Sequence, residues 1–321
     1  MGRIFVFLDG ALGDVLLSLP CLNSLRKNNA KLHVACRPEV AVLLRETGIA
    51  AETSNAGSMR YTSLYAGNAD TALRQELAAY ERVYVFTVDP KASLTAALEK
   101  ANKHTIVVRT IPEDDGTPVG AFRCRQMGLA ADSLMERQLP VPQPYPDFVQ
   151  AMLKRQGYDG FSPLVTVHPG SGGTQKRWPL DGFFSLIQGM QAEASVFAAV
   201  LTGPAEDETF NTRIEAFCAG RNGVVHLVDA DLVAVAALLD RSWLYVGNDS
   251  GITHLAAAVG AHVLALYGPT DPVRWRPAGP HVEVLASADL SRLTVETVKD
   301  AALRLFRQSL AEGRKLEGDH S

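Results

Sequence analysis

A carboxylate follows a glycine in the first of four segments whose side chains could do chemistry. This segment, DGALGD, covers residues 9–14 and places Gly13 directly before Asp14. Asp14 is therefore a candidate general base, with a simple N-cap at the start of a helix as the alternative. The spacing does not match G-x-G-x-x-G, so the segment lacks the dinucleotide fingerprint.

A second segment, HPGSGGTQKRWP at residues 168–179, combines glycines, hydroxyls and two cations. Glycines permit close approach of a ligand to the backbone, and the polar side chains supply donors and positive charge. This composition predicts a phosphate site, with a flexible surface turn as the alternative. The segment is not a Walker loop, because G-x-x-x-x-G-K-[ST] is not met. The residues expected to bind are Ser171, Gly172, Gly173, Lys176 and Arg177.

A third segment, GNDSGITH at residues 247–254, is expected to follow a strand and to open a helix. Ser250 and His254 are four residues apart and would share a helix face. The backbone N–H groups and the dipole at such a helix start favour an anion. In the alternative interpretation Asp249 is only a cap and His254 only a packed core histidine.

A fourth segment, YGPTDP at residues 267–272, would close over the same ligand through Thr270 and Asp271, or form a Pro/Gly turn with no ligand. Asp229 and Asp231 have the D-x-D form that holds a metal under a nucleotide diphosphate, but they precede an expected helix, which favours capping. The histidines lack H-x-x-x-H and H-E-x-x-H spacing, so we predict no metal ligands.

The elements that position these segments alternate between strands and helices along the chain. This alternation with short links predicts an α/β fold with parallel sheets covered on both faces. The expected strands are residues 3–8, 31–36, 82–87, 105–109, 164–167, 196–201, 224–227, 243–246 and 263–267. The expected helices are residues 15–27, 38–46, 71–80, 94–100, 181–191, 206–218, 232–239, 253–259 and 295–311, and residues 50–68 are expected to be loop.

The domain boundary is predicted from prolines at every second position of residues 139–148. Such a segment is semi-extended and typical of a linker. At about 150 residues per domain, the chain length also favours two domains. We therefore expect Rossmann-like domains over residues 1–145 and 146–321 that face a cleft, with the final helix packing back on the first domain. Ligands should bind beyond the carboxyl ends of the strands.

Composition excludes several classes of protein. The 321 residues carry a net charge of −4, which argues against a nucleic-acid partner, since phosphates require a basic excess. Apolar runs fall short of the roughly 18 residues that span a bilayer, and Asp9 interrupts the apolar start, so we predict no signal peptide. The four cysteines include no C-x-x-C pair. Reduced thiols in a cytoplasmic protein are therefore expected.

Taken together, the motifs resemble the bacterial heptosyltransferase family, glycosyltransferase family 9. The resemblance rests on Gly13-Asp14 followed by Leu19-Pro20 and Leu25-Arg26, on residues 168–179, on Gly247–Gly251 with His254, and on Gly268–Asp271. It implies the GT-B architecture of two facing Rossmann-like domains. It also implies transfer of a heptose from an ADP-linked donor to the lipopolysaccharide inner core, with inversion and without a metal or other cofactor.

The resemblance also implies roles for single residues. Asp14 would be the catalytic base, with Gly13 on the acceptor side, and Lys176 would neutralise the departing diphosphate. The nucleotide would be held by Asp249, Ser250, Gly251 and His254, and Gly268–Asp271 would complete its pocket. The acceptor would be a glycan or glycolipid, with peripheral contact at the inner face of the cytoplasmic membrane.

The first domain departs from the family pattern in two places. Residues 8–12 hold no basic residue, and Val88-Asp89-Pro90 stands where members often show an acidic-Leu-Gln-Gly stretch. These positions would face the acceptor, so use of a nucleotide sugar is better supported than use of heptose. Another nucleotide sugar in polysaccharide or glycoside assembly and a nucleotide-binding module without catalysis remain alternatives. A Rossmann oxidoreductase is disfavoured by the missing fingerprint.

Overall fold

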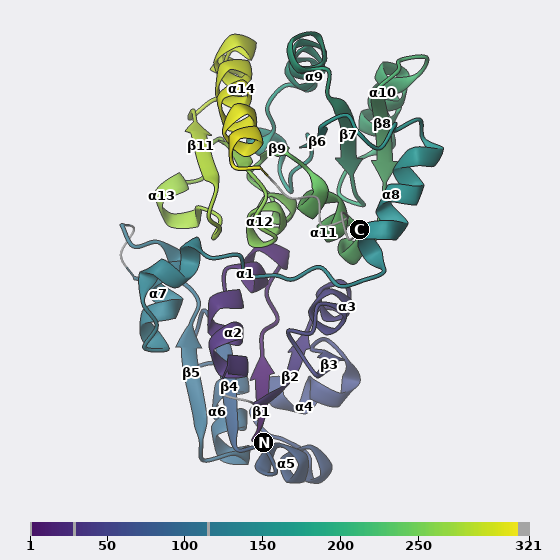
Figure 1. The fold of residues 1–321 in the computed structure, drawn as a ribbon. Coiled ribbons are helices and arrows are strands. Elements are labelled where there is room, and N and C mark those ends of the chain that lie inside the picture. The colour runs from purple at the N-terminus through teal and green to yellow at the C-terminus, as the bar shows by residue number, and fades with distance from the viewer. Residues whose placement is uncertain (1, 28–29, 114–115, 314–321) are drawn as a thin grey trace. The chain divides into compact units, whose positions relative to one another are not determined.

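The computed structural model describes residues 2–27, 30–113 and 116–313. The chain divides into two compact units, and each is built around one parallel sheet (Figure 1). Unit 1 comprises Met1–Leu134 with Gln138–Pro140, and unit 2 comprises Met135–Arg137 with Val141–Ser321. Among the described residues, none of the helices is long and apolar enough to cross a bilayer.

The sheet of unit 1 has the order β3-β2-β1-β4-β5, and all of its strand pairs are parallel. The strand order reverses at β1, so the carboxyl end of β1 is the topological switch point, where ligands of open α/β sheets bind. The strands are β1 (Arg3–Phe7), β2 (Lys31–Cys36), β3 (Glu52–Asn55), β4 (Arg82–Thr87) and β5 (Thr105–Arg109). The helices are α1 (Leu12–Leu16), α2 (Leu19–Lys27), α3 (Pro38–Glu46), α4 (Thr62–Tyr65), α5 (Thr71–Ala78), α6 (Ser93–Ala101) and α7 (Val119–Gln126).

Unit 2 repeats this plan with six strands in the order β11-β10-β9-β6-β7-β8, again all parallel. Its switch point lies between the neighbouring strands β6 and β9. The strands are β6 (Leu164–His168), β7 (Phe197–Thr202), β8 (Val224–Val228), β9 (Leu244–Asn248), β10 (Val263–Tyr267) and β11 (Val282–Ala286). The helices are α8 (Tyr145–Arg155), α9 (Leu180–Ala194), α10 (Glu208–Cys218), α11 (Leu232–Arg241), α12 (Gly251–Ala258), α13 (Pro272–Trp275) and α14 (Val295–Ala311).

Each unit has its own hydrophobic core. In unit 1, aromatic side chains of β1 and the segment after β3 pack with the leucines of α5 and α6. In unit 2, α14 packs against α9, β9 and β10, and its apolar face joins the core of that unit. The expected return of the final helix to the first domain stays a prediction.

The helix expected over residues 15–27 is in fact two helices. α1 ends after Leu16, and Ser18 donates its hydroxyl to the Asp14 carbonyl (3.0 Å) before α2 begins at Leu19. Pro20 then lies in the first turn of α2, where its missing N–H leaves no unsatisfied partner. The single-helix prediction was wrong because apolar periodicity continued across the break.

Two segments expected to be irregular form regular structure. Residues 50–68 contain the edge strand β3, a 3-10 turn at Met59–Tyr61 and the short helix α4. β3 is polar and only half-buried, so it lacks the apolar pattern of the other strands. Part of the expected linker is also helical, because α8 begins at Tyr145 with Pro146 in its first turn.

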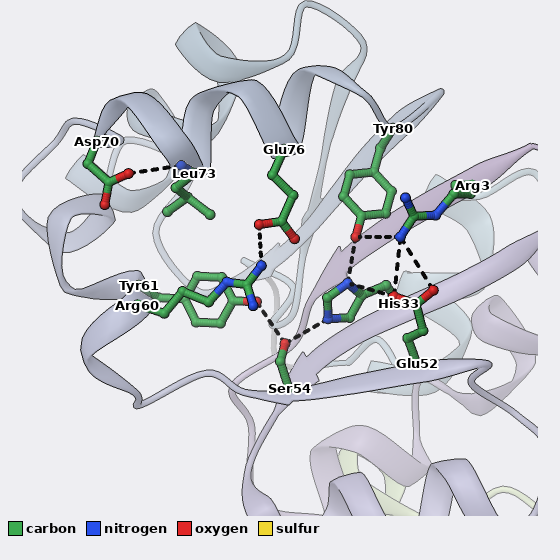
Figure 2. Close-up of polar contacts among 10 residues, drawn as sticks. All are labelled: Arg3, His33, Glu52, Ser54, Arg60, Tyr61, Asp70, Leu73, Glu76 and Tyr80. Atoms are coloured by element: carbon green, nitrogen blue, oxygen red, sulfur yellow. Dashed lines mark hydrogen bonds and ion pairs between the residues drawn. The ribbon is translucent and has the colours of Figure 1, made fainter.

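A buried histidine fastens the segment after β3 to the sheet of unit 1 (Figure 2). His33 of β2 contacts the Tyr80 hydroxyl through Nδ1 (2.5 Å) and Ser54 Oγ through Nε2 (2.9 Å). Ser54 in turn contacts the Tyr61 hydroxyl (2.7 Å). These contacts tie the edge strand and the end of the α5 segment to β2. Burial lowers the pKa of His33, partly opposed by the carboxylates of Glu52 and Glu76.

We expect the stability of the protein to fall in acid partly through His33. The unfolded chain takes up a proton near pH 6.5, whereas burial lowers the pKa of His33 in the folded state, so the folded protein takes up this proton only at lower pH. The free energy of unfolding should therefore decrease as the pH falls below 6.5 toward the lower folded pKa. Urea unfolding at pH 7.5 and 5.0 measures this loss, which His33→Gln should reduce and the exposed-site control His104→Gln should keep. A wild-type pH dependence in His33→Gln would contradict this role.

Candidate functional site

The candidate base Asp14 lies at the switch point of unit 1. Ala11 is the N-cap of α1, and Asp14 is the third residue of that helix. The interpretation of Asp14 as a simple N-cap is therefore wrong. Its side chain is 35% exposed, so the carboxylate can reach a substrate. Gly10 must lack a side chain, because an added Cβ would lie 2.6 Å from Asp14 Cβ.

A fully buried arginine holds this carboxylate in place. Arg123 of α7 donates from Nη2 to Asp14 Oδ1 (3.0 Å) and from Nη1 to the Asp14 carbonyl (2.5 Å). It also donates to Ser18 Oγ (2.9 Å) and to the Thr110 carbonyl (3.0 Å). Burial lowers the pKa of Arg123, and the Asp14 charge acts in the opposite direction. The structure thus makes Asp14 both anchored and accessible.

Arg123 was missed by the sequence analysis. It belongs to no motif and lies 109 residues from Asp14 in the chain. Only the arrangement of α7 beside the first strand–helix connection brings the two together. Gly13, the expected acceptor-side residue, lies within α1 and is partly exposed. Its role stays a prediction.

The second and third sequence segments meet at the switch point of unit 2. Lys176 donates from Nζ to Asp249 Oδ2 (2.8 Å), and Ser171 donates its hydroxyl to the Asp249 carbonyl (2.8 Å). The Lys176 side chain is 40% exposed, whereas that of Asp249 is 9% exposed. The lysine charge therefore lies at the surface of the loop, with its counter-charge beneath it.

Asn248 is the buried link between these loops. Its side chain accepts a hydrogen bond from the Trp178 backbone N–H (2.9 Å) and donates to the Pro169 carbonyl (2.8 Å). The fourth segment reaches the same place, since an added Cβ at Gly268 would lie 2.9 Å from the Gln175 carbonyl. Three loops that are distant in sequence thus form one surface at the carboxyl ends of β6, β9 and β10.

Ser250, rather than Asp249, caps α12. Its hydroxyl accepts a hydrogen bond from the Thr253 backbone N–H (3.4 Å) and lies 3.3 Å from His168 Nδ1. The interpretation of Asp249 as a cap is therefore wrong.

Burial and the nearby Arg177 lower the pKa of His168 to about 4, so His168 is neutral at pH 7. His254 is buried in the first turn of α12, and Gly251 is the first residue of this helix.

Arg177 points into the protein and shapes the second loop. It donates to the Ser171 carbonyl through Nε (3.1 Å) and Nη2 (2.8 Å), and Nη2 lies 3.7 Å from Glu206 Oε1. The Glu206 side chain is 2% exposed, and an added Cβ at Gly170 would lie 2.1 Å from its Oε1. The sequence did not indicate that Glu206 supports this loop, because Glu206 follows β7 whereas the loop follows β6.

Gly172 and Gly173 differ from the crowded glycines of these loops. An added Cβ at either position would meet open space, so packing within the chain does not require glycine there. This fits the prediction that a ligand approaches the backbone closely.

Of the remaining residues singled out from the sequence, one is partly exposed and two are helix caps. Thr270 is partly exposed, and Asp271 caps α13 by accepting from the Val273 backbone N–H (2.8 Å). Asp231 caps α11 by accepting from the backbone N–H groups of Val233 (3.0 Å) and Ala234 (2.9 Å). The capping interpretation of the D-x-D pattern is thus confirmed for Asp231.

Comparison with known proteins gives the relationship of this chain. A family model described as glycosyltransferase family 9 (heptosyltransferase) matches residues 124–301, more than half of the chain. This chain belongs to glycosyltransferase family 9. This family 9 member is 31% identical over 152 residues to lipooligosaccharide heptosyltransferase 2 of Haemophilus influenzae, covering 42% of each chain. It is 33% identical over 119 residues to lipopolysaccharide heptosyltransferase 2 of Escherichia coli, covering 34% of this chain and 32% of that one.

These alignments span less than half of the length of the curated relatives. Solved structures match the family 9 chain more widely. A family 9 glycosyl transferase from Veillonella parvula covers 96% of this chain and 97% of its own, at 19% identity and a TM-score of 0.78. The Escherichia coli ADP-heptose lipopolysaccharide heptosyltransferase II covers 96% and 99%, at 20% identity and a TM-score of 0.75. The predicted family and the GT-B fold class, with two Rossmann-like domains, are confirmed.

We expect Arg123 to be essential to the stability of unit 1 of this family 9 member. Arg123→Met keeps the apolar stem but removes the cation paired with the Asp14 carboxylate and the donor to the Thr110 carbonyl. The Asp14 carbonyl keeps the Ser18 hydroxyl as a donor. Breaking a buried ion pair from one side costs about 3–5 kcal/mol, and the partial exposure of Asp14 lowers this to roughly 2–4 kcal/mol. Urea unfolding should show this loss.

The matched control is Arg109→Met, which removes a surface ion pair with Glu113. Exposed pairs contribute about 0–1 kcal/mol. Equal stability of the Arg123→Met and Arg109→Met variants would show that the buried arginine does not anchor Asp14.

Proposed function

We propose that this protein transfers a heptose from ADP-heptose to a lipopolysaccharide inner-core acceptor, with inversion at the anomeric carbon and without a metal ion. The observation that carries the proposal is the state of Asp14, whose carboxylate is fixed by buried Arg123 and yet partly exposed at a switch point. A base that is already oriented loses little entropy on reaching the transition state. Family membership and the names of the relatives support the donor and the acceptor class.

Asp14 performs the proton transfer in this proposal. As the acceptor hydroxyl oxygen attacks the anomeric carbon, its proton passes to the Asp14 carboxylate. The bond from the anomeric carbon to the diphosphate oxygen breaks, and ADP leaves with the electron pair. One displacement of this kind inverts the anomeric carbon. A general base of this type contributes about 10²–10⁴-fold.

The loops of unit 2 receive the diphosphate. Lys176 is exposed enough to donate to a phosphate oxygen while it still donates to Asp249, and so to meet the charge that develops on the leaving group. Backbone N–H groups of Gly172 and Gly173 and the start of α12 at Ser250 and Gly251 supply further donors. We assign to the same nucleotide-binding surface, in a supporting role, the residues Ser171, Arg177 and His254.

Asp249 has a different task from the one that the family resemblance implied. A carboxylate has no donor for a phosphate oxygen, and its Oδ2 accepts from Lys176. We assign Asp249 to positioning the lysine. Thr270 and Asp271 remain assigned to the nucleotide pocket, beside the close approach of Gly268 to the second loop.

Catalysis without metal follows from this assignment of charge. Lys176 and the helix dipole of α12 supply the positive field at the diphosphate. Asp231, the second residue of the D-x-D pattern, is engaged as the α11 cap. No further cofactor is proposed.

The acceptor carries a lipid in this proposal. The proposal therefore includes peripheral contact of the protein with the inner face of the cytoplasmic membrane.

A second candidate is a family 9 enzyme that uses another nucleotide sugar or another acceptor. It is favoured by the connection after β1, where Asp9 stands in a stretch that is often basic in the family. Asp9 Oδ2 accepts from the Tyr65 hydroxyl (3.3 Å), and its Oδ1 lies 3.9 Å from Arg37 Nε. This surface carries a carboxylate where a phosphorylated acceptor would prefer a cation.

The Asp14→Asn variant tests the proposed chemistry. The amide keeps the shape of the side chain and an acceptor for Arg123 but removes the base, so ADP release from ADP-heptose with a lipid-linked core acceptor should fall by about 10²–10⁴-fold. ADP affinity should be unchanged, and wild-type turnover should survive excess EDTA. Near-wild-type turnover of Asp14→Asn would exclude Asp14 as the base, and activity restored by Mg²⁺ after EDTA would exclude the metal-free mechanism. Higher turnover with another nucleotide sugar would favour the second candidate.

Lys176→Ala should lower turnover rather than donor affinity. Loss of one donor that acts on the transition state costs about 10²–10³-fold in turnover, while binding common to ground and transition states changes affinity alone. Steady-state kinetics and calorimetric titration with ADP separate the two effects. Lys299→Ala is the matched control, since Lys299 forms a surface pair with Glu193 in the same unit. An unchanged turnover with weaker ADP binding would show that Lys176 only binds the ground state.

A further inference from the structure

Two histidines and a glutamate meet at the amino-terminal edge of the sheet in unit 2. His262 directly precedes β10, and His281 directly precedes β11. The parallel register pairs Val263 with Val282, so the two histidines are cross-strand neighbours on one face of the sheet. Glu312, the C-cap of α14, reaches the same edge.

The geometry of these three side chains is compact. The imidazole rings of His262 and His281 stack with centroids 4.2 Å apart and planes at 12°. Glu312 Oε2 lies 3.3 Å from His262 Nε2 and 3.7 Å from His281 Nδ1. One ligand atom from each residue lies within 4.8 Å of the others. A single carboxylate oxygen therefore faces nitrogen atoms of both rings.

The two nitrogen-to-oxygen separations are longer than ordinary hydrogen bonds and close to the spacing of ligands that share a metal ion. Because a metal lies in the plane of the imidazole that binds it, one of the two stacked rings would turn out of the stack when the ion binds. N–H···O hydrogen bonds are usually about 2.7–3.2 Å long. Zinc binds histidine nitrogen and carboxylate oxygen at about 2.0–2.2 Å, so tetrahedral ligands lie about 3.3–3.5 Å apart. We propose that His262, His281 and Glu312 form a binding site for a divalent metal of the zinc type. The ion would fasten the end of α14 to the first residues of β10 and β11.

The burial of the three residues fits a site that loads from one side. The His262 side chain is 4% exposed, while those of His281 and Glu312 are 35% and 53% exposed. Two imidazoles and one carboxylate are donors that suit Zn²⁺. Three protein ligands leave one tetrahedral position for a water molecule.

This site is distinct from the candidate donor site in the same unit. His262 precedes β10, whereas Gly268 and the fourth sequence segment follow it. The two sites therefore lie at opposite edges of one parallel sheet. The inference does not rest on the proposed glycosyl transfer, and its test does not use turnover.

Zinc titration of the EDTA-stripped full-length protein tests the site. Calorimetry should detect one equivalent of bound Zn²⁺, and zinc should raise the Tm of the wild type. His281→Gln and Glu312→Gln each remove a partly exposed ligand, so they should fold normally by circular dichroism. Loss of an outer-shell partner alone weakens metal sites by about 10–100-fold, so loss of a direct ligand should weaken binding by roughly 100-fold or more.

The matched control is His104→Gln, which removes an exposed histidine of unit 1 and should bind zinc like the wild type. Absence of zinc binding at micromolar concentrations would overturn the proposal. Wild-type zinc affinity in both His281→Gln and Glu312→Gln would overturn it as well, because the metal would then sit elsewhere. A zinc-dependent rise in Tm that both variants lose would support it.

Discussion

All strands within each sheet run parallel, so the loops that follow them leave from one edge of that sheet. The remaining features of the candidate site depend on this constraint. Where the strand order reverses, neighbouring loops diverge and leave backbone groups that adjacent strands do not pair. In unit 1 this occurs after β1, and in unit 2 it occurs after β6 and β9. The candidate residues Asp14, Lys176 and Asp249 lie at these places, where the fold leaves polar groups.

Two buried polar side chains satisfy those groups in different ways. Asn248 is neutral and connects two loops through one amide, which accepts from Trp178 and donates to Pro169. Arg123 brings a charge inside the protein, where desolvation is costly, and it is offset by the Asp14 carboxylate and by carbonyl oxygens. A neutral link suffices where the loops must only be held. A charged link stands where a carboxylate must point in one direction.

Much of the fold could be predicted from the sequence because strand and helix periodicities differ and because caps are local. β4, β5, β10 and α14 have the predicted bounds, and the Asp231 cap follows from one residue and the helix after it. β3 escaped prediction because an edge strand need not be apolar. The pairing of Arg123 with Asp14, and that of His262 with His281, could not be predicted, since each depends on which elements become neighbours in space.

The contact of Lys176 with Asp249 limits how these two positions can evolve. Loss of the lysine alone would leave a nearly buried carboxylate without a positive partner. Loss of the aspartate alone would remove the contact that fixes the position of the lysine ammonium. Either single change therefore carries a penalty that the matching second change relieves. Among descendants of this chain, the two positions should be replaced together or kept together, although 73 residues separate them.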